Sequence, residues 1–231
     1  MQTNFSKTLI RDGGYREWNF GMILLLKKSW ELLKKLNKQL NFIVIGGWGI
    51  FLWTHAMKSK DLDIILTRWD DLEVIKKQFE ARKNDRLKRY EIVISDIDVD
   101  IYIPHYSQLV IPCEDLITMT TIREGFEVLK PEPLMILKQQ AFIDRKDSIK
   151  GQKDRVDILS LLISNVVNFN EYKRLVDQYK ISHFKDELIK IIQTTKEEFA
   201  YLNITNPREV KKLKKRWIEQ LRTDVRSSSS K

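Results

Sequence analysis

The stretch GGWGIFLWTHAMKSKDLDIIL, residues 46–66, decides the fold. It follows the run NFIVI, whose apolar and β-branched residues are typical of a buried strand. Two glycines begin the stretch, the short helical segment WGIFLWTHAM follows, and a second strand, LDIILT, comes with two aspartates. A hydrophobic core needs neither the paired glycines nor the aspartates. Their presence beside two buried strands therefore indicates a site.

The composition is that of an ordinary globular protein. Its 231 residues, of which 42% are hydrophobic, can bury one sizeable core, with or without a helical appendage. The net charge of +9 favours a polyanionic partner or a phosphorylated ligand. Cys113 is the only cysteine, which excludes an intrachain disulfide. The longest apolar stretch, residues 42–53, is too short to span a bilayer, and no secretory signal pattern is found, so we expect a cytoplasmic protein without a membrane partner.

The first 130 residues have the pattern of an α/β core preceded by a helix. Periodic leucines predict a helix over residues 19–40. A further helix is predicted over residues 70–83, and two strands, RYEIVI and DVDIYIP, flank the tight turn SDID. Further short strands are expected near residues 109–111 and 126–129.

Beyond the PEP motif at residues 131–133 the pattern is almost entirely helical. Helices are predicted over residues 133–147, 153–164, 170–179, 182–193 and 207–222, and the low-complexity end RSSSSK is expected to be disordered. We therefore predict an α+β fold, with a mixed β-sheet and flanking helices followed by a C-terminal helical layer or subdomain. The expected divisions are 1–130 for the core, 131–224 for a helical region that completes the site, and 225–231 for a disordered tail.

Two aspartate pairs accompany the strands LDIILT and DVDIYIP. Alternate residues of a strand share a face, so Asp61 and Asp63 project together while their apolar neighbours turn into the core. Their Cα atoms should lie about 7 Å apart, at roughly 3.3 Å per residue, which is close enough for both carboxylates to bind one divalent cation or a pair of them. Asp98 and Asp100 repeat the pattern. If the two strands are neighbours, three or four carboxylates converge on one patch.

An alternative interpretation is that these aspartates form the polar face of half-solvated strands. Aspartate is depleted in strands, however, and four of them at aligned positions in a chain with surplus lysine indicate a task that needs negative charge. Mg²⁺, or Mn²⁺ in its place, suits hard carboxylate oxygens and keeps coordination positions for phosphate. Gly46 and Gly47 would let a ligand approach the backbone closely and would present helix-terminal amides to a phosphate.

Together these motifs resemble those of the nucleotidyltransferase superfamily with the DNA polymerase beta-like fold. Its signature is an apolar strand, a GG or GS pair, a short helix, a D-x-D strand and a third acid on a later strand, which IVIGGWG, KDLDIIL and VDIYIP match. The resemblance implies a nucleotidyltransferase-like mixed sheet, a nucleoside triphosphate substrate, with ATP as the first candidate, and dependence on Mg²⁺. The implied roles are triphosphate binding for Gly46 and Gly47, metal binding for Asp61 and Asp63, and the third catalytic and metal-binding acid for Asp100.

The helical part resembles a branch of small prokaryotic nucleotidyltransferases that includes the AbiEii-type toxins. In these, an apolar helix with a lysine precedes a basic segment and an aspartate-bearing helix, which PEPLMILKQQAFIDRKDSIKGQKDRVDILSLL matches, although Lys153 stands where an arginine is usual. The resemblance covers residues 42–162. It implies nucleotide contacts for Gly46, Gly47, Lys60, Lys138, Lys153 and Asp154.

Structural roles are open for the same helical residues. Asp154 would then lie near the N-terminus of a helix, and Asp157 would pair with Lys153 or Arg155. Lys138 would extend its stem over the edge of the core.

Two basic clusters offer a surface for phosphates. Such clusters most often form solvated faces, but together they could hold a nucleic-acid backbone, with Trp217 as a stacking group and tRNA or another RNA as the acceptor. The clusters consist of Arg82, Lys83, Arg86, Lys88 and Arg89, and of Lys211, Lys212, Lys214, Lys215 and Arg216.

The sequence thus predicts a metal-dependent nucleotidyltransferase that moves a nucleoside monophosphate from an NTP to a hydroxyl acceptor. The acceptor stays open among RNA or tRNA, a protein hydroxyl and a small hydroxylated molecule, and Asp98 competes with Asp100 for the role of third acid. One alternative is a non-catalytic module that uses the same fold to bind nucleic acid or a toxin or antitoxin partner. Another is a purely structural αβ protein in which the glycines and the acid pairs coincide by chance.

Overall fold

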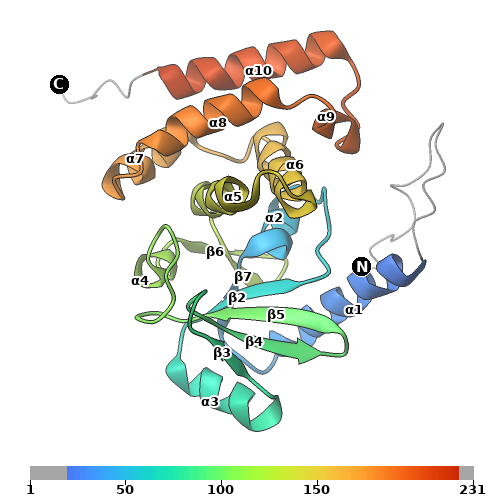
Figure 1. Ribbon diagram of the computed structural model, residues 1–231, viewed down its shortest axis with the longest axis vertical. Helices are drawn as coiled ribbons and strands as arrows, with labels where there is room; N and C mark the ends of the chain where they lie inside the picture. The colour runs from blue at the N-terminus through green and yellow to red at the C-terminus, as the bar shows by residue number, and fades with distance from the viewer. Residues whose placement is uncertain (1–19, 224–231) are drawn as a thin grey trace.

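The computed structural model describes residues 20–223, and over that range it contains one seven-stranded mixed sheet of order β3-β4-β5-β2-β1-β7-β6 (Figure 1). The predicted α+β class is confirmed, whereas the predicted disordered tail at residues 225–231 lies outside the described residues. The strands are β1 (Phe42–Val44), β2 (Leu62–Leu66), β3 (Arg82–Asn84), β4 (Arg89–Ile94), β5 (Ile97–Tyr102), β6 (Thr120–Arg123) and β7 (Phe126–Leu129).

The two aspartate-bearing strands are neighbours in the middle of the sheet. β2 pairs in parallel with β5, and Asp63 is the register partner of Asp100. β1 pairs antiparallel with β2 and parallel with β7, so the glycine turn after β1 begins beside the strand that carries Asp63. The remaining neighbours, β3–β4, β4–β5 and β6–β7, are antiparallel. The predicted convergence of the two strands is therefore correct.

Helices cover the sheet in successive layers. α2 packs on the sheet, α5 and α6 pack on α2, and α7, α8 and α10 lie farther out (Figure 1). Within the described range, no helix is long and apolar enough to cross a membrane. The helices are α1 (Phe20–Leu36), α2 (Gly46–Thr54), α3 (Trp69–Gln78), α4 (Cys113–Leu116), α5 (Pro131–Arg145), α6 (Ile149–Ile163), α7 (Phe169–Gln178), α8 (His183–Thr194), α9 (Glu198–Tyr201) and α10 (Pro207–Arg222).

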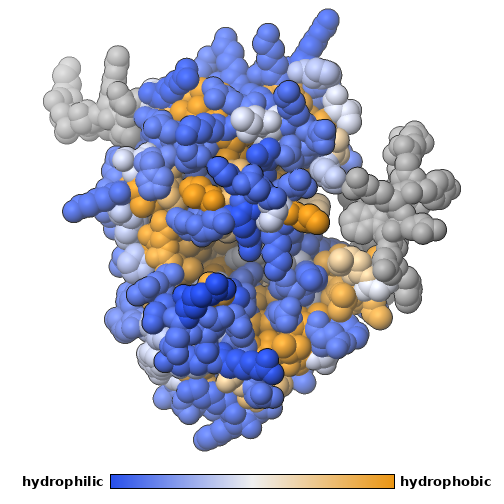
Figure 2. Space-filling view, viewed as in Figure 1, coloured by the Kyte–Doolittle hydropathy of each residue, from blue (hydrophilic) through white to orange (hydrophobic). Residues whose placement is uncertain are grey.

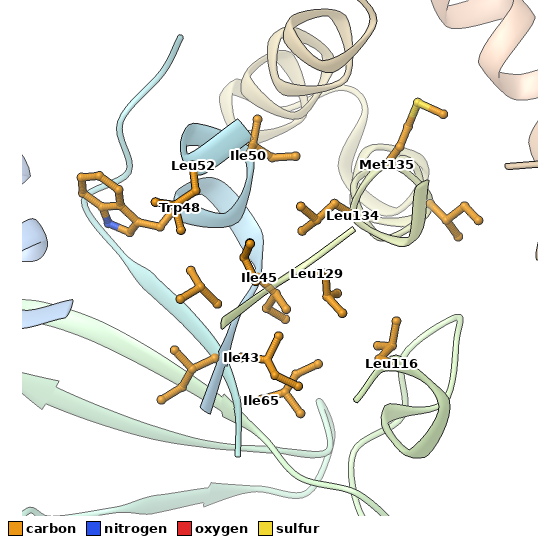
Figure 3. Packing of buried hydrophobic residues seen from close by; sticks show 14 of the residues in the cluster. Ile43, Ile45, Trp48, Ile50, Leu52, Ile65, Leu116, Leu129, Leu134 and Met135 are labelled. Atoms are coloured by element: carbon orange, nitrogen blue, oxygen red, sulfur yellow. The ribbon is translucent and has the colours of Figure 1, made fainter. Parts of the chain in front are cut away.

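The core fixes α2 between the sheet and α5. Ile43 and Ile65, on the paired strands β1 and β2, are fully buried, as is Leu134 of α5, which lies toward α2 (Figure 3). A Cβ built on Gly49 would lie 3.0 Å from Leu134 Cδ2, so this glycine lets α2 and α5 approach each other closely. Each fully buried aliphatic side chain of this kind stabilises the fold by about 1.5–3 kcal/mol. α2, which begins at the glycine turn, is therefore packed between the sheet and α5.

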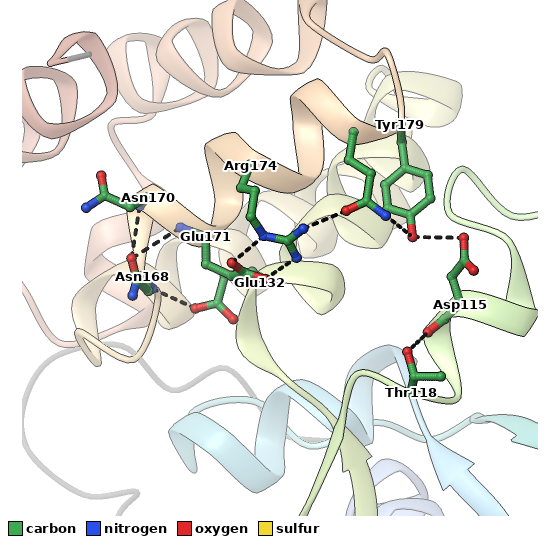
Figure 4. Close-up of polar contacts among 9 residues, drawn as sticks. Asp115, Thr118, Glu132, Asn168, Asn170, Glu171, Arg174 and Tyr179 are labelled. Carbon is green, nitrogen blue, oxygen red and sulfur yellow. Dashed lines mark hydrogen bonds and ion pairs between the residues drawn. The ribbon is translucent and has the colours of Figure 1, made fainter. Parts of the chain in front are cut away.

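Polar contacts join α7, an outer helix, to α4 and α5 (Figure 4). The Tyr179 hydroxyl, just after α7, donates to Asp115 Oδ2 of α4 at 2.9 Å. At the other end of α7, the Asn168 side chain caps the helix and the Asn168 amide donates to Glu132 Oε1 of α5 at 2.6 Å. Because both ends of α7 are hydrogen-bonded to other elements, the position of α7 relative to α4 and α5 is fixed.

Several predicted boundaries are wrong. The helix predicted over residues 70–83 ends at Gln78, because residues 82–84 form β3 and pair with β4. No strand forms at residues 109–111, where a loop inserts Ile111 into the core, and β6 forms instead at residues 120–123. α6 begins at Ile149 rather than Lys153, since the Ser148 hydroxyl caps it by accepting from the Gly151 amide at 3.0 Å.

Candidate active site

Asp63 and Asp100 form the centre of the candidate site. They face the same side of the sheet from neighbouring strands. The glycine turn closes on Asp63, because Gly46 has a φ of +60° and a Cβ built on it would lie 2.6 Å from Asp63 Cγ. The Ile45 amide also donates to the Asp63 carbonyl oxygen at 3.0 Å. Only glycine fits beside this carboxylate, which gives the first glycine of the pair a steric reason.

The other two aspartates lie at the near end of the same strands. Asp61 precedes β2 by one residue and is partly buried, with Lys60 Nζ 4.0 Å from its Oδ1. Asp98 is exposed, and its register partner on β4 is Val93. Asp100 stands directly opposite Asp63, whereas Asp98 is displaced by two residues toward the β4–β5 turn. The geometry therefore favours Asp100 over Asp98 as the third acid.

Arg89, which the sequence predicts in a basic surface cluster, belongs to this site instead. Its Nη1 lies 2.7 Å from Asp100 Oδ2, and its Nη2 lies 2.8 Å from Glu91 Oε1. Nη1 also donates to the Tyr102 hydroxyl at 3.3 Å. The two-residue turn between β4 and β5 carries the signal that could have found it. That turn sets Glu91 opposite Asp100 and hence Arg89 on the same face.

The two central carboxyls repel each other. Burial raises the pKa of Asp63, against the charges of Lys138 and Lys153, which lower it. Burial and then the charge of Asp63 raise the pKa of Asp100 to about 7, against the opposing charge of Arg89. Both shifts have the direction expected of acids that are withdrawn from water and placed side by side. The pair is therefore poised to bind positive charge or a proton.

A buried ionic network supports the site from the helical side. Lys138 Nζ of α5 lies 3.1 Å from Asp154 Oδ1 and 2.7 Å from Asp157 Oδ2, both on α6. Arg145 Nε lies 2.7 Å from Asp154 Oδ2. Asp154 is 1% exposed and holds Lys138 and Arg145. It also lines the cavity that Gly47 and Lys153 line, so its predicted contact with a nucleotide stays a prediction.

The structural alternatives for these residues need correction. Asp154 lies in the second turn of α6, whose N-cap is Ser148, so it does not serve the helix N-terminus. Asp157 pairs with Lys138 rather than with Lys153 or Arg155. Lys138 is itself buried and does not merely cover the edge of the core.

Two cavities meet at the central carboxylates, and both are lined by Asp63, Asp100, Lys138 and Arg145. Figure 2 shows this face of the molecule hollowed between the sheet half and the helical half. The glycine-side cavity, about 550 Å³, is also lined by Gly47, Ser59, Lys60, Asp61, Lys150 and Lys153. The tyrosine-side cavity, about 430 Å³, is also lined by Gly46, Tyr102, Leu109, Val110, Leu134, Ala141 and Asp144, so the two glycines of the pair line different cavities.

The charges of the two cavities differ. In the glycine-side cavity, Lys153 Nζ donates to the Ser59 hydroxyl at 3.3 Å, and Lys60 and Lys150 add further positive charge. The described cations of the tyrosine-side cavity are Arg89, Lys138 and Arg145, and each is bound to a carboxylate. The glycine-side cavity is therefore the better match for a polyanion.

The second basic cluster is remote from the site. α10 packs on α7 and α8 and, among the described residues, contributes none to the two cavities (Figure 1). Trp217 is 1% exposed and stacks on Phe199, so the prediction that it stacks on a base is wrong. Lys214 Nζ donates to the Gln193 carbonyl oxygen at 3.0 Å near the end of α8, which is a structural role.

No protein-family model matches the sequence, and no curated protein matches it significantly. Solved structures similar to the chain include an antigenic nucleotidyltransferase-like protein from Paracoccidioides brasiliensis, at 16% identity and a TM-score of 0.43, with 78% of this chain and 92% of that one covered. Another is ANT(2")-Ia in complex with adenylyl-2"-tobramycin, at 14% identity and a TM-score of 0.46, with 69% and 99% covered. A third is the Megavirus polyadenylate synthase, at 13% identity and a TM-score of 0.39, with 71% and 41% covered.

Identities and TM-scores this low describe a loose likeness in the path of the chain. The roles of individual residues in this chain therefore depend on the geometry of its own site.

Proposed function

We propose that the protein is a metal-dependent nucleotidyltransferase. One observation carries the proposal: Asp63 and Asp100 stand side by side where a glycine turn and two cavities meet. In the proposed reaction, a hydroxyl oxygen of the acceptor forms a bond to the α-phosphorus of a nucleoside triphosphate. The bond from that phosphorus to the bridging oxygen breaks, pyrophosphate leaves, and the acceptor carries a nucleoside monophosphate.

The triphosphate belongs in the glycine-side cavity. Among residues 20–223, no side chain caps the start of α2, and its first turn holds no acidic residue, so its amides are left for an anion. Lys60, Lys150 and Lys153 supply positive charge around the same space. Lys138, also proposed to contact phosphate, instead acts through its charge, because its ammonium group is held by Asp154 and Asp157.

The donor atoms at the centre suit Mg²⁺ or Mn²⁺. Hard carboxylate oxygens are the preferred ligands of these ions, and a cation would relieve the repulsion between Asp63 and Asp100. Within the described residues, no three His, Cys, Asp or Glu side chains lie close enough together to hold an ion in their present positions. Asp61, Asp63 and Asp100 would hold it after a side-chain movement, and the ion would neutralise charge on the phosphates.

Asp100 is the proposed base. Its ionised carboxylate would accept the proton of the attacking hydroxyl. Arg89, 2.7 Å away, fixes the orientation of this carboxylate. Most of the rate enhancement would come from positioning and from stabilisation of charge on the transferred group.

The acceptor belongs in the tyrosine-side cavity. Its walls include Leu109, Val110, Leu134 and Ala141, and its cations are already paired with carboxylates. Such a lining favours a small hydroxylated molecule or an exposed protein hydroxyl over the phosphate backbone of an RNA. ATP is the triphosphate to test first.

The proposal is tested by binding and transfer together. Mg–ATP should raise the Tm of the wild type, and Asp63→Asn should lose most of that gain because the central carboxylate is gone. Ala141→Trp should fill the tyrosine-side cavity, keep Mg–ATP binding and lose transfer to the acceptor. Equal stabilisation of wild type and Asp63→Asn by Mg–ATP would place the nucleotide elsewhere and contradict the proposal.

A further inference from the structure

Ser59 occupies the space that a side chain on residue 47 would fill. A Cβ built on Gly47 would lie 2.7 Å from Ser59 Cβ and 2.8 Å from Ser59 Oγ. Both contacts are shorter than real Cβ atoms make, so the second glycine of the pair is required by the serine. The hydroxyl of Ser59 thus lies directly beside the position that a side chain on residue 47 would take.

We propose that Ser59 is a triphosphate-binding residue of this chain, and that it delivers from the loop before β2 the hydroxyl that Gly47 lacks. This inference rests on the proposed function, because it assigns a further contact to the same nucleotide. The chain then has a glycine–glycine pair in sequence and a serine hydroxyl beside the second glycine in space.

The hydrogen bonds of Ser59 leave its proton free for a ligand. Lys153 Nζ donates to Ser59 Oγ at 3.3 Å, which uses one lone pair of the hydroxyl. A serine hydroxyl can also donate once, and among the described residues no group accepts from it. Both side chains line the glycine-side cavity. A phosphate oxygen can accept from the hydroxyl and from the ammonium at once, and its charge suits the lysine.

The position of Ser59 is fixed by buried contacts. The Ser29 hydroxyl of α1 donates to the Ser59 carbonyl oxygen at 3.1 Å. The same hydroxyl accepts from Trp48 Nε1 of α2 at 2.7 Å. Ser29, Trp48 and Ser59 are 0%, 1% and 3% exposed. Because the loop is tied to both helices, the hydroxyl meets a ligand without reorganisation of the loop.

A purely structural role for Ser59 makes a different prediction. If its hydroxyl only fills space beside Gly47, Ser59→Ala changes the Tm and leaves ligand affinity unchanged. If the hydroxyl binds phosphate, Ser59→Ala weakens Mg–ATP and Mg–tripolyphosphate alike by about tenfold to a hundredfold, the range of a hydrogen bond to a charged group. Tripolyphosphate lacks the nucleoside, so it isolates the phosphate contact.

The decisive experiment moves the hydroxyl from one residue to the other. Full-length wild type, Ser59→Ala, Gly47→Ser and the double variant Gly47→Ser/Ser59→Gly are compared by calorimetric titration with both probes. Gly47→Ser alone should lower the Tm and weaken binding, because its Cβ meets Ser59. In the double variant the nearest remaining neighbour of that Cβ is Lys153 Nζ at 3.4 Å, so binding should return to within about threefold of wild type.

The matched control is Ser107→Ala. Ser107 is also buried, and its hydroxyl accepts from the Ile103 amide at 2.9 Å, but it lines neither cavity. This variant should lose stability and bind both probes as the wild type does.

Two results would overturn the inference. One is equal affinity of wild type and Ser59→Ala for both probes, and the other is a double variant that binds no better than Gly47→Ser. A wild type that binds neither probe would overturn the proposed function and this inference together. That result is distinguishable from the first two, in which the wild type does bind.

Discussion

Asp63 on β2 and Asp100 on β5 are register partners across a parallel strand pair, with the glycine turn packed against the first and Arg89 bound to the second. Each carboxyl therefore has a different environment. Asp63 is closed in by Gly46, whereas Asp100 is held by a guanidinium group. This asymmetry suits one acid that stays in place and one that exchanges a proton.

The stability of the metal-free protein should depend on pH through Asp100. The pKa of Asp100 in the folded protein, about 7, lies above the ordinary value of 3.8. The contribution of the protonated Asp100 carboxyl to the free energy of unfolding is therefore fully present below about pH 4 and is lost as the pH rises through 7. Asp100→Asn removes this loss. The difference in unfolding free energy between Asp100→Asn and wild type, measured in urea with a chelator present, should therefore grow from pH 4 to pH 8. Mg²⁺ at pH 8 should shrink it, and a difference independent of pH would contradict the assigned environment.

Lys138 should be needed for folding stability. Lys138→Met leaves Asp154 with one partner and Asp157 with none in the buried network, which should cost about 3–5 kcal/mol of unfolding free energy. Lys138→Met/Asp157→Leu removes the stranded charge as well, so it should recover part of the loss. Urea titrations of the three proteins measure both effects. If the single variant were as stable as the wild type, the network would have no supporting role.

Charge reversal on α10 should leave the reaction intact. Lys211→Glu/Lys212→Glu changes two exposed residues that line neither site cavity and spares Lys215, which pairs with Glu219. Mg–ATP affinity and nucleotide transfer should match the wild type at low and at moderate salt. A different result would show that the acceptor is a polyanion bound to α10. In that case transfer by the wild type would fall as the salt concentration rises, and the variant would transfer nothing at either salt concentration.

The central strands of the site could be predicted because their signals are local. Asp61 and Asp63 alternate with apolar residues in one short run, and so do Asp98 and Asp100, which sets their faces without knowledge of the tertiary fold. The steric need for Gly46 also has a local sign, since a glycine turn after a buried strand is a common place for close approach.

The supporting residues could not be predicted in the same way, because their roles depend on contacts between distant segments. Ser59 acquires its position from Ser29 on α1 and from Gly47. Lys138 is paired by two aspartates of the following helix, and its surroundings in sequence are those of a lysine at a core edge. Trp217 lies among lysines in the sequence, which favours a surface role. In the structure its position on α10 instead buries it against Phe199.

Transfer of label from ATP tests the central claim most directly. Wild type and Asp100→Asn are incubated with Mg²⁺ and with either α-labelled or γ-labelled ATP, in an extract separated into small molecules, RNA and protein. The wild type should pass the α label to one fraction and release the γ label as pyrophosphate, while Asp100→Asn should still bind Mg–ATP and lose transfer by several orders of magnitude. If the wild type passed the α label to no fraction, or if Asp100→Asn passed it as fast, the account of this site as a nucleotidyltransferase centre would be contradicted.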